Sequence, residues 1–190
     1  MANATLIEVM HKPGVTDPVG KGLAHDITHL GLARVKGVAS AQLYQIHGSL
    51  ATHDKTRIAR DLLADPILHD YRIESGASPQ PSPDGTIGPM RPWTDGPASS
   101  GSKGCWGGRR SPGEAKHGLV IDVWYKPGVT DAVGESVMKG IRDLNIPGVK
   151  EVRTGMRYYL KGVTRQDAAE KIASALLVNP LVHESIIHAD

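Results

Sequence analysis

Near the start of the chain, the spacing of hydrophobic residues predicts a strand, a turn and an amphipathic helix. Leu6–His11 mixes β-branched and polar residues in a short run that is typical of a strand. A Lys-Pro-Gly turn follows at residues 12–14, because proline disfavours helix at the preceding residue and glycine permits a sharp bend. Asp17 then has the chemistry to cap a helix. The apolar stripe of that helix consists of Val19, Leu23, Ile27 and Leu30.

The next part of the pattern predicts two further strands, a second helix and a last strand. Gly31 is suited to stop the first helix. We expect residues 35–46 to form two strands joined by a bend near Ala41, with one bent strand as the alternative. The second helix ends at Asp65-Pro66, and residues 67–73 form the last strand. The apolar face of that helix consists of Ile58, Ala59, Leu62 and Leu63.

The whole pattern then occurs a second time. Lys12–Asp17 returns letter for letter as Lys126–Asp131, and the spacing between matching positions stays constant up to Ile73 and Ile187. Without a gap, roughly a third of about 69 aligned pairs are identical, which indicates a duplicated unit. The second copy is therefore predicted to have the same elements as the first. Its strands are expected at 119–125, at 149–160 as two strands joined by a bend near Gly155, and at 181–187. Its first helix carries Val133, Val137, Ile141 and Leu144 and stops at Asn145, and its second carries Ala169, Ile172, Ala173, Leu176 and Leu177 and ends at Asn179-Pro180.

This order predicts an α+β fold made of two ferredoxin-like βαββαβ repeats, each with its helices on one face of an antiparallel sheet. The expected domains are residues 1–75, a linker at 76–117, and residues 118–190. Units of about 70 residues bury little surface and are marginal alone. We therefore expect the two repeats to pack against each other as an internal pseudo-dimer.

The segment between the repeats has a different composition. Residues 76–117 hold seven of the 13 prolines together with Gly and Ser, and they show no apolar period. Such composition is typical of a disordered or extended linker. About 40 flexible residues would span roughly 35 Å, which is enough to let the repeats pair.

Charge argues against a nucleic-acid partner. Residues 1–75 hold 8 Lys and Arg against 8 Asp and Glu, and residues 117–190 hold 9 against 9, so neither repeat has the basic excess that phosphate backbones require. The chain has no Phe and few Tyr or Trp on which bases could stack. An RNA-binding module on a ferredoxin-like sheet is thus disfavoured.

Cysteine use and hydropathy indicate a cytoplasmic protein without a membrane partner. Cys105 is the single cysteine, so no internal disulfide forms, which fits a reducing compartment. The N-terminus leads into a strand without a basic segment, and no apolar stretch approaches about 18 residues.

The opening and closing motifs resemble those of the PurS family, the small subunit of phosphoribosylformylglycinamidine (FGAM) synthase. Lys12–Pro18 followed by Gly20 matches the family's opening pattern, and residues 62–66 leading to 70–74 match the closing one. The resemblance covers residues 5–75 and again 118–188. The second copy diverges more: Ala132, Asn145 and Ser185 stand where the first copy has proline, glycine and tyrosine.

The resemblance implies a non-catalytic subunit of a three-part enzyme in purine biosynthesis. In that family the small subunit works as a dimer that bridges a large ATP-binding synthetase subunit and a glutaminase subunit, and it helps ammonia pass between them. Both subunits are therefore the expected partners, and no cofactor is expected. One repeat would face the synthetase and the other would mainly complete the dimer, and further self-association of chains stays open.

The residues expected to contact partners lie at the turn that precedes the first helix of each repeat. This turn is not a phosphate loop, because it lacks the several glycines and the Gly-Lys-Ser/Thr ending that such loops need. Glycine inside a helix costs up to about 1 kcal/mol relative to alanine, so its use there indicates a close approach, either by a partner or by the repeat's own strand. The expected interface residues are Lys12, Pro13, Gly14, Asp17, Gly20, Lys126, Pro127, Gly128, Asp131 and Gly134.

No catalytic or metal-binding residues are assigned from the sequence. His25 and His29 have a spacing that can hold zinc, but the second copy has Lys139 and Asp143 there. The alternative function is a stand-alone metabolite-sensing module, because small duplicated folds of this class bind ligands at their interfaces.

Overall fold

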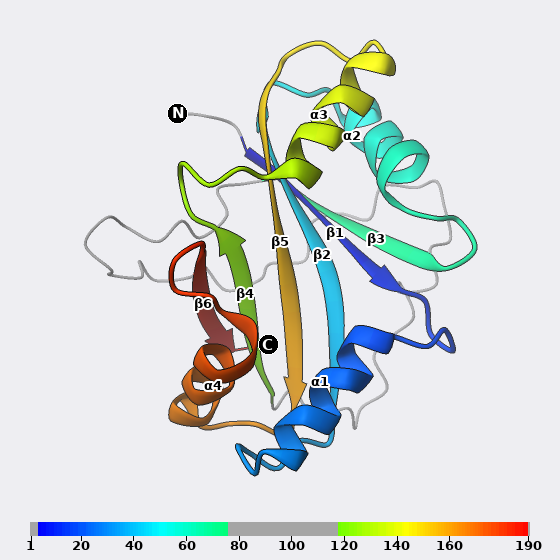
Figure 1. Ribbon diagram of the computed structural model, residues 1–190. Coiled ribbons are helices and arrows are strands. Elements are labelled where there is room, and N and C mark those ends of the chain that lie inside the picture. The colour runs from blue at the N-terminus through cyan, green and yellow to red at the C-terminus, as the bar shows by residue number, and fades with distance from the viewer. Residues whose placement is uncertain (1–3, 76–117, 190) are drawn as a thin grey trace. The chain divides into compact units, whose positions relative to one another are not determined.

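The computed structural model describes residues 4–75 and 118–189, and these residues of both repeats belong to one compact unit. They form a single sheet with all the helices over one of its faces (Figure 1). The predicted linker at 76–117, with Cys105, lies outside the described residues.

Each repeat contains three strands, one α-helix and a second helix that continues as a π-helical segment. The first repeat consists of β1 (Ala4–His11), α1 (Pro18–His29), β2 (Gly37–Gly48), α2 (Thr52–Arg57), η1 (Ile58–Leu63) and β3 (His69–Ser75). The second consists of β4 (Gly118–Tyr125), α3 (Ala132–Asp143), β5 (Val149–Lys161), α4 (Gln166–Ile172), η2 (Ala173–Leu177) and β6 (His183–Ala189). The predicted α+β class and the duplication are confirmed.

The predicted division of residues 35–46 into two strands is wrong. β2 is one strand, and its partner β5 is one strand as well, so each repeat reads β-α-β-α-β. The pairing continues without a break through Ala41↔Arg157 and Leu43↔Gly155, and it shifts only between His47 and Gly48. Pairing with β5 along its whole length therefore keeps residues 37–48 as one extended strand, without the predicted bend.

The last strand of each repeat begins two residues later than the pattern predicts. The Asp65 carboxylate accepts hydrogen bonds from the backbone N–H of Ile67 and of Leu68, at 2.7 and 3.0 Å. In the second repeat the Asn179 side chain accepts from the N–H of Leu181, at 3.0 Å. This side-chain turn holds the two apolar residues outside the sheet.

The six strands lie in the order β3-β1-β2-β5-β4-β6, and all neighbouring pairs are antiparallel. Exchanging each strand for its counterpart in the other repeat reverses this order, so the two halves of the sheet are equivalent. The central pair β2·β5 runs from Gly37↔Lys161 to Gly48↔Val149 and joins the repeats into one sheet.

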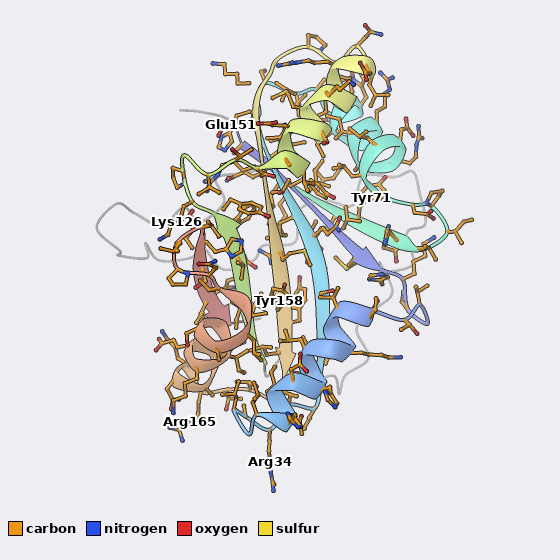
Figure 2. The ribbon with its side chains drawn as sticks, in the orientation of Figure 1. Arg34, Tyr71, Lys126, Glu151, Tyr158 and Arg165 are labelled. Carbon is orange, nitrogen blue, oxygen red and sulfur yellow. The ribbon has the colours of Figure 1, made fainter. Side chains whose placement is uncertain are left out.

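The first hydrophobic core lies beneath α1 and α4. Leu23 and Ile27 of α1, from the first repeat, pack there with residues of the second repeat. Tyr158 on β5 lies beside this core in the layer between the sheet and the helices (Figure 2). The buried residues contributed by the second repeat are Ile121, Val123, Leu160, Val163, Ala169, Ile172 and Ala173.

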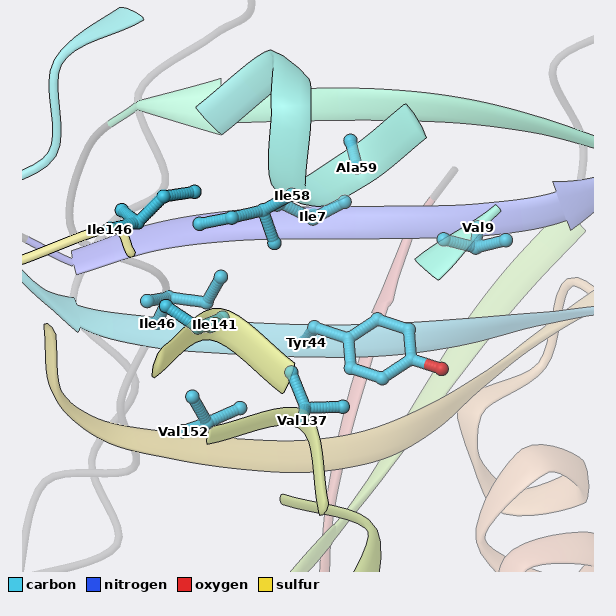
Figure 3. Close-up of a cluster of buried hydrophobic side chains, with 10 residues drawn as sticks. All are labelled: Ile7, Val9, Tyr44, Ile46, Ile58, Ala59, Val137, Ile141, Ile146 and Val152. Atoms are coloured by element: carbon cyan, nitrogen blue, oxygen red, sulfur yellow. The ribbon is translucent and has the colours of Figure 1, made fainter. Parts of the chain in front are cut away.

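The second core also combines the two repeats, but here the helix comes from the second repeat and most of the other residues come from the first. Val137 and Ile141 of α3, from the second repeat, pack onto strands of the first repeat (Figure 3). Their partners from the first repeat are Ile7, Val9, Tyr44, Ile46, Ile58 and Ala59. Because each core is built from both repeats, neither repeat can bury its hydrophobic residues alone.

The helix ends follow the predicted chemistry, but the predicted apolar stripe is only partly buried. Gly31 has φ +65° and Asn145 has φ +56°, the left-handed conformation that ends a helix. Leu23 and Ile27 are buried, whereas Val19 is 46% exposed and Leu30 is 55% exposed. The two ends of α1 therefore offer apolar surface that the fold does not use.

In the described part of the chain, each helix is too short or too polar to cross a lipid bilayer.

Candidate functional site

The turn before α1 is fastened to the loop before β3. Gly14 has φ +87°, which glycine adopts without strain, and the N–H of Val15 donates to the carbonyl of Lys12 at 3.0 Å. The Lys12 Nζ donates to the carbonyl of Pro66 at 2.5 Å. Lys12 thus closes a turn–loop surface, made of residues 12–19 and 65–68.

The second repeat builds the same surface from matching residues. Gly128 has φ +86°, and the Lys126 Nζ donates to the carbonyl of Pro180 at 2.5 Å. We call the two regions the turn–loop surfaces, with residues 126–133 and 179–182 forming the second. In both copies the lysine ammonium donates to a backbone carbonyl and so helps to hold the surface together.

Asp17 and Asp131 lie beneath these surfaces and join helix to strand. The Asp17 Oδ1 accepts from the N–H of Gly20 at 2.8 Å, which caps α1 as predicted. Its Oδ2 accepts from the N–H of Ser40 on β2 at 2.6 Å. Asp131 binds Gly134 and Thr154 in the same way. Each aspartate therefore sets the position of its helix on the sheet.

Gly20 and Gly134 are buried, and each approaches its own repeat's strand. A Cβ on Gly20 would lie 2.5 Å from the Val38 carbonyl oxygen and 2.5 Å from the Asp17 carboxylate. A Cβ on Gly134 would lie 2.7 Å from the Val152 carbonyl oxygen. Of the two readings of these glycines, close packing on the strand is the one that these distances explain.

The solvent-facing part of each turn–loop surface is apolar. Pro13 and Gly14 are exposed, and so are Pro127 and Gly128. Large hydrophobic residues lie beside them, and none of these was among the interface residues expected from the sequence. These residues are Val19, Ile67 (78% exposed), Leu68, Val133 and Leu181 (82% exposed).

The two turn–loop surfaces lie at opposite ends of the sheet. β1 runs antiparallel to β2, β2 to β5, and β5 to β4, so β1 and β4 point in opposite directions. The turns that follow β1 and β4 are therefore on opposite sides of the molecule, as Figure 1 shows. One sheet thus presents two corresponding surfaces in opposite directions.

A buried charged cluster on the face of the sheet away from the helices was not predicted from the sequence. The Arg157 guanidinium donates from Nε and Nη2 to the two oxygens of Asp122, both at 2.7 Å. Its Nη1 donates to Glu8 on β1 at 3.4 Å. Tyr159 also donates to Glu8, and His188 Nε2 lies 3.2 Å from Asp122.

These contacts set the protonation of the cluster. Burial lowers the pKa of Arg157, but its hydrogen bonds with Asp122 and the nearby negative charges outweigh burial and raise the pKa overall. Burial raises the pKa of Asp122, yet hydrogen bonds with Arg157 and His188 hold it below its usual value. Burial and then the charge of Glu8 raise the pKa of the Tyr159 hydroxyl.

The cluster differs between the two repeats. Glu8 and Asp122 occupy matching positions, but the residue that matches Arg157 in the first repeat is Leu43. Arg157 of the second repeat therefore contacts one buried carboxylate from each repeat. An acidic residue at the same place in two otherwise apolar strands was the only sign of this cluster in the sequence.

The histidines noted in the sequence do not form a metal site with neighbouring ligands. The rings of His25 and His29 stack with their centroids 5.9 Å apart. Within residues 4–75 and 118–189, no group of three or more His, Cys, Asp or Glu side chains is placed to hold a metal ion. The buried carboxylates Glu8 and Asp122 are engaged by cations and a tyrosine, which is a structural arrangement.

Comparison with known protein families agrees with this duplicated architecture. The model of the PurS family, described as phosphoribosylformylglycinamidine (FGAM) synthase, matches residues 4–76 and again residues 119–190. A search of curated proteins returned no match. The two matched regions cover most of the chain and coincide with the two repeats of the fold. The chain thus contains the PurS unit twice and belongs to the PurS family, which implies a role in FGAM synthase and thereby in purine biosynthesis.

Proposed function

We propose that this chain is a non-catalytic assembly subunit of FGAM synthase. It bridges the synthetase subunit and the glutaminase subunit, and it supports the transfer of ammonia between them. The observation that carries the proposal is the pair of equivalent, exposed turn–loop surfaces at opposite ends of one sheet. A body with two outward binding surfaces has the geometry that a bridge requires.

The distance between the two surfaces is held by the shared cores. Ile27 of the first repeat is fully buried among residues of the second, and Ile141 of the second is fully buried among residues of the first. Interiors packed in this way resist deformation. In our proposal the two repeats take the place of the two subunits of a dimer, so that the bridge is present in every chain.

The chemistry of the surfaces suits protein contacts. Ile67 and Leu181 are the most exposed large hydrophobic residues of the described chain, and they occupy matching positions. Exposed apolar patches rimmed by polar groups mark protein interaction sites. Burying one of them fully would contribute about 1.5–3 kcal/mol to an interface.

The divergence of the repeats supports different partners for the two surfaces. The first surface has Pro18 and a 44% exposed Leu68, whereas the second has Ala132 and a half-buried Val182. We assign one surface to each catalytic subunit.

The single cysteine of the chain, Cys105, rules out an internal disulfide and fits a protein that works in the cytosol.

Reconstitution with separately purified subunits tests the proposal. The synthetase alone should form FGAM from ammonium, and turnover from glutamine should require the synthetase, the glutaminase and this chain together. This chain alone should hydrolyse neither glutamine nor ATP. Glutamine-dependent turnover that is equal with and without the chain, with all three proteins folded, would overturn the proposal.

A further inference from the structure

A recess of about 350 Å³ lies where the two repeats meet, at the end of the molecule formed by the α1–β2 loop and the β5–α4 loop. Leu32, Ala33 and Arg34 line it from the first repeat. The lining residues from the second repeat are Gly162, Val163, Thr164, Arg165, Asp167, Ala168 and Lys171. Its size is at the lower end of the range for small-ligand sites.

The lining of the recess has a net positive charge, although each repeat as a whole is neutral. Arg34, Arg165 and Lys171 line it, and Asp167 is its one acidic residue. Asp167 pairs with Arg165, whose Nε and Nη2 donate to it at 3.0 and 2.7 Å, so Arg34 and Lys171 are the cations of the recess without an acidic hydrogen-bond partner in the described part of the chain. The side chains of Arg34 and Lys171 donate no hydrogen bond to another described residue, and both are exposed.

A further lysine packs beside one of the lining residues. Lys36 lies beside Gly162, with its Cγ 3.0 Å from where a Cβ on that glycine would be, and its N–H donates to the carbonyl of Lys161 at 2.8 Å. Figure 2 shows Arg34 and Arg165 at this same end of the molecule, on the two neighbouring elements. Cations that line one recess raise the local concentration of anions.

The two arginines of the recess have no counterparts in the other repeat. The residue that matches Arg34 in the second repeat is Gly148, and the residue that matches Arg165 in the first repeat is Ala51. Each arginine is therefore present in one copy only, yet the two copies place them in the same recess. General surface charge would not explain why each repeat has an arginine that the other lacks, at the two positions that meet in the recess.

The chemistry of the recess fits a phosphate group on a small organic molecule. Guanidinium groups present several N–H donors in a planar fork that matches phosphate oxygens, and the lysine ammonium adds a point charge. The apolar residues Leu32, Val163 and Ala168 also line the recess. We propose that this recess binds the phosphate group of a small phosphate monoester.

Calorimetric titration of the full chain at constant ionic strength tests the site. The probes are inorganic phosphate, ribose 5-phosphate, adenosine monophosphate and adenosine. We expect both monoesters to bind, inorganic phosphate to bind more weakly, and adenosine to give no heat. Equal binding of adenosine and its monophosphate, or no binding of any probe, would overturn the proposal.

Two variants assign the binding to the recess. The double variant Arg34→Gly, Arg165→Ala carries the residues of the matching repeat positions, and it should weaken monoester binding about tenfold or more. The control Arg60→Ala, Arg142→Ala also removes two exposed arginines, but outside the recess, and it should bind as the wild type does. Equal loss in both double variants would mean general charge attraction and would contradict the site.

A third variant covers the effect of freeing Asp167. Lys171→Gln removes one charge without disturbing the Arg165–Asp167 pair, and it should weaken monoester binding by a smaller factor. Competition by poly-glutamate with the monoester, at an affinity above that of the monoester, would assign the recess to an acidic protein segment instead. The proposal does not depend on the bridging function, because binding is measured on the isolated chain.

Discussion

Arg157 on β5 reaches Glu8 on β1, 149 positions earlier in the chain, with 3.4 Å between its Nη1 and the Glu8 Oε2. The same guanidinium holds both oxygens of Asp122. A side chain of the second repeat thus compensates a buried charge of the first. The matching position of the first repeat holds Leu43, which cannot return the interaction.

Removing this arginine is expected to destabilise the fold strongly. Arg157→Leu leaves Asp122 buried without its guanidinium partner and leaves Glu8 with Arg72, at 3.7 Å, as its only cation among the described residues, and breaking a buried pair in this way costs about 3–5 kcal/mol. Urea unfolding measures the change. The triple variant Arg157→Leu, Glu8→Leu, Asp122→Leu should recover much of the loss, since it leaves no buried charge unpaired.

A matched control separates charge from position. Arg60→Leu breaks the exposed pair with Asp61 and should leave the free energy of unfolding unchanged within error. If Arg157→Leu proves equally harmless, the buried cluster does not stabilise the fold.

The loss of folding stability at acidic pH should depend on Asp122. Its pKa is lower in the folded chain than in the unfolded chain, so it stabilises the fold above the unfolded value of about 4, and this contribution is lost as the pH falls through the folded pKa. We expect the free energy of unfolding to fall less steeply below about pH 4 in Asp122→Asn than in the wild type. Urea titrations at a series of pH values give both slopes, and parallel slopes would contradict this assignment.

Two glycines on matching helices should respond in opposite ways to alanine. Gly134→Ala places a Cβ 2.7 Å from the Val152 carbonyl oxygen, and overpacking of this kind costs about 1–3 kcal/mol. Gly22→Ala in α1 meets nothing within 4 Å and should stabilise by up to about 1 kcal/mol through helix propensity. Thermal melting compares them, and the reverse order would refute the close-approach reading of Gly134.

The mixed cores predict that damage in one repeat appears in the other. Ile141→Ala removes a fully buried side chain of α3 and should cost about 2–5 kcal/mol. Because Ile141 packs on the first repeat, amide exchange in β1 should accelerate together with exchange in α3. Val133→Ala, on the exposed side of the same helix, is the control. Faster exchange confined to the second repeat would show that the repeats are separate units.

The local features of the fold could be predicted because each rests on a few neighbouring residues. A Lys-Pro-Gly turn with a left-handed Gly14 and a helix capped by Asp17 are visible in a short segment. The unbroken length of β2 and the contact of Arg157 with Glu8 could not be predicted from the sequence. Both depend on the register between strands of different repeats. The same holds for the recess, whose Arg34 and Arg165 come from different copies.

The bridging account depends on the two turn–loop surfaces having different partners. Ile67→Asp and Leu181→Asp place a charge on one surface each, at positions so exposed that the fold should tolerate it. Leu30→Asp, at the opposite end of α1, is the matched control because Leu30 is also exposed and apolar.

Light scattering on the three mixed subunits of FGAM synthase tests this account most directly. The wild type and Leu30→Asp should form the complete complex. Each surface variant should lose one catalytic subunit and keep the other, and the lost subunit should differ between Ile67→Asp and Leu181→Asp. Complete complexes with both surface variants, or loss of the same subunit from both, would contradict the account.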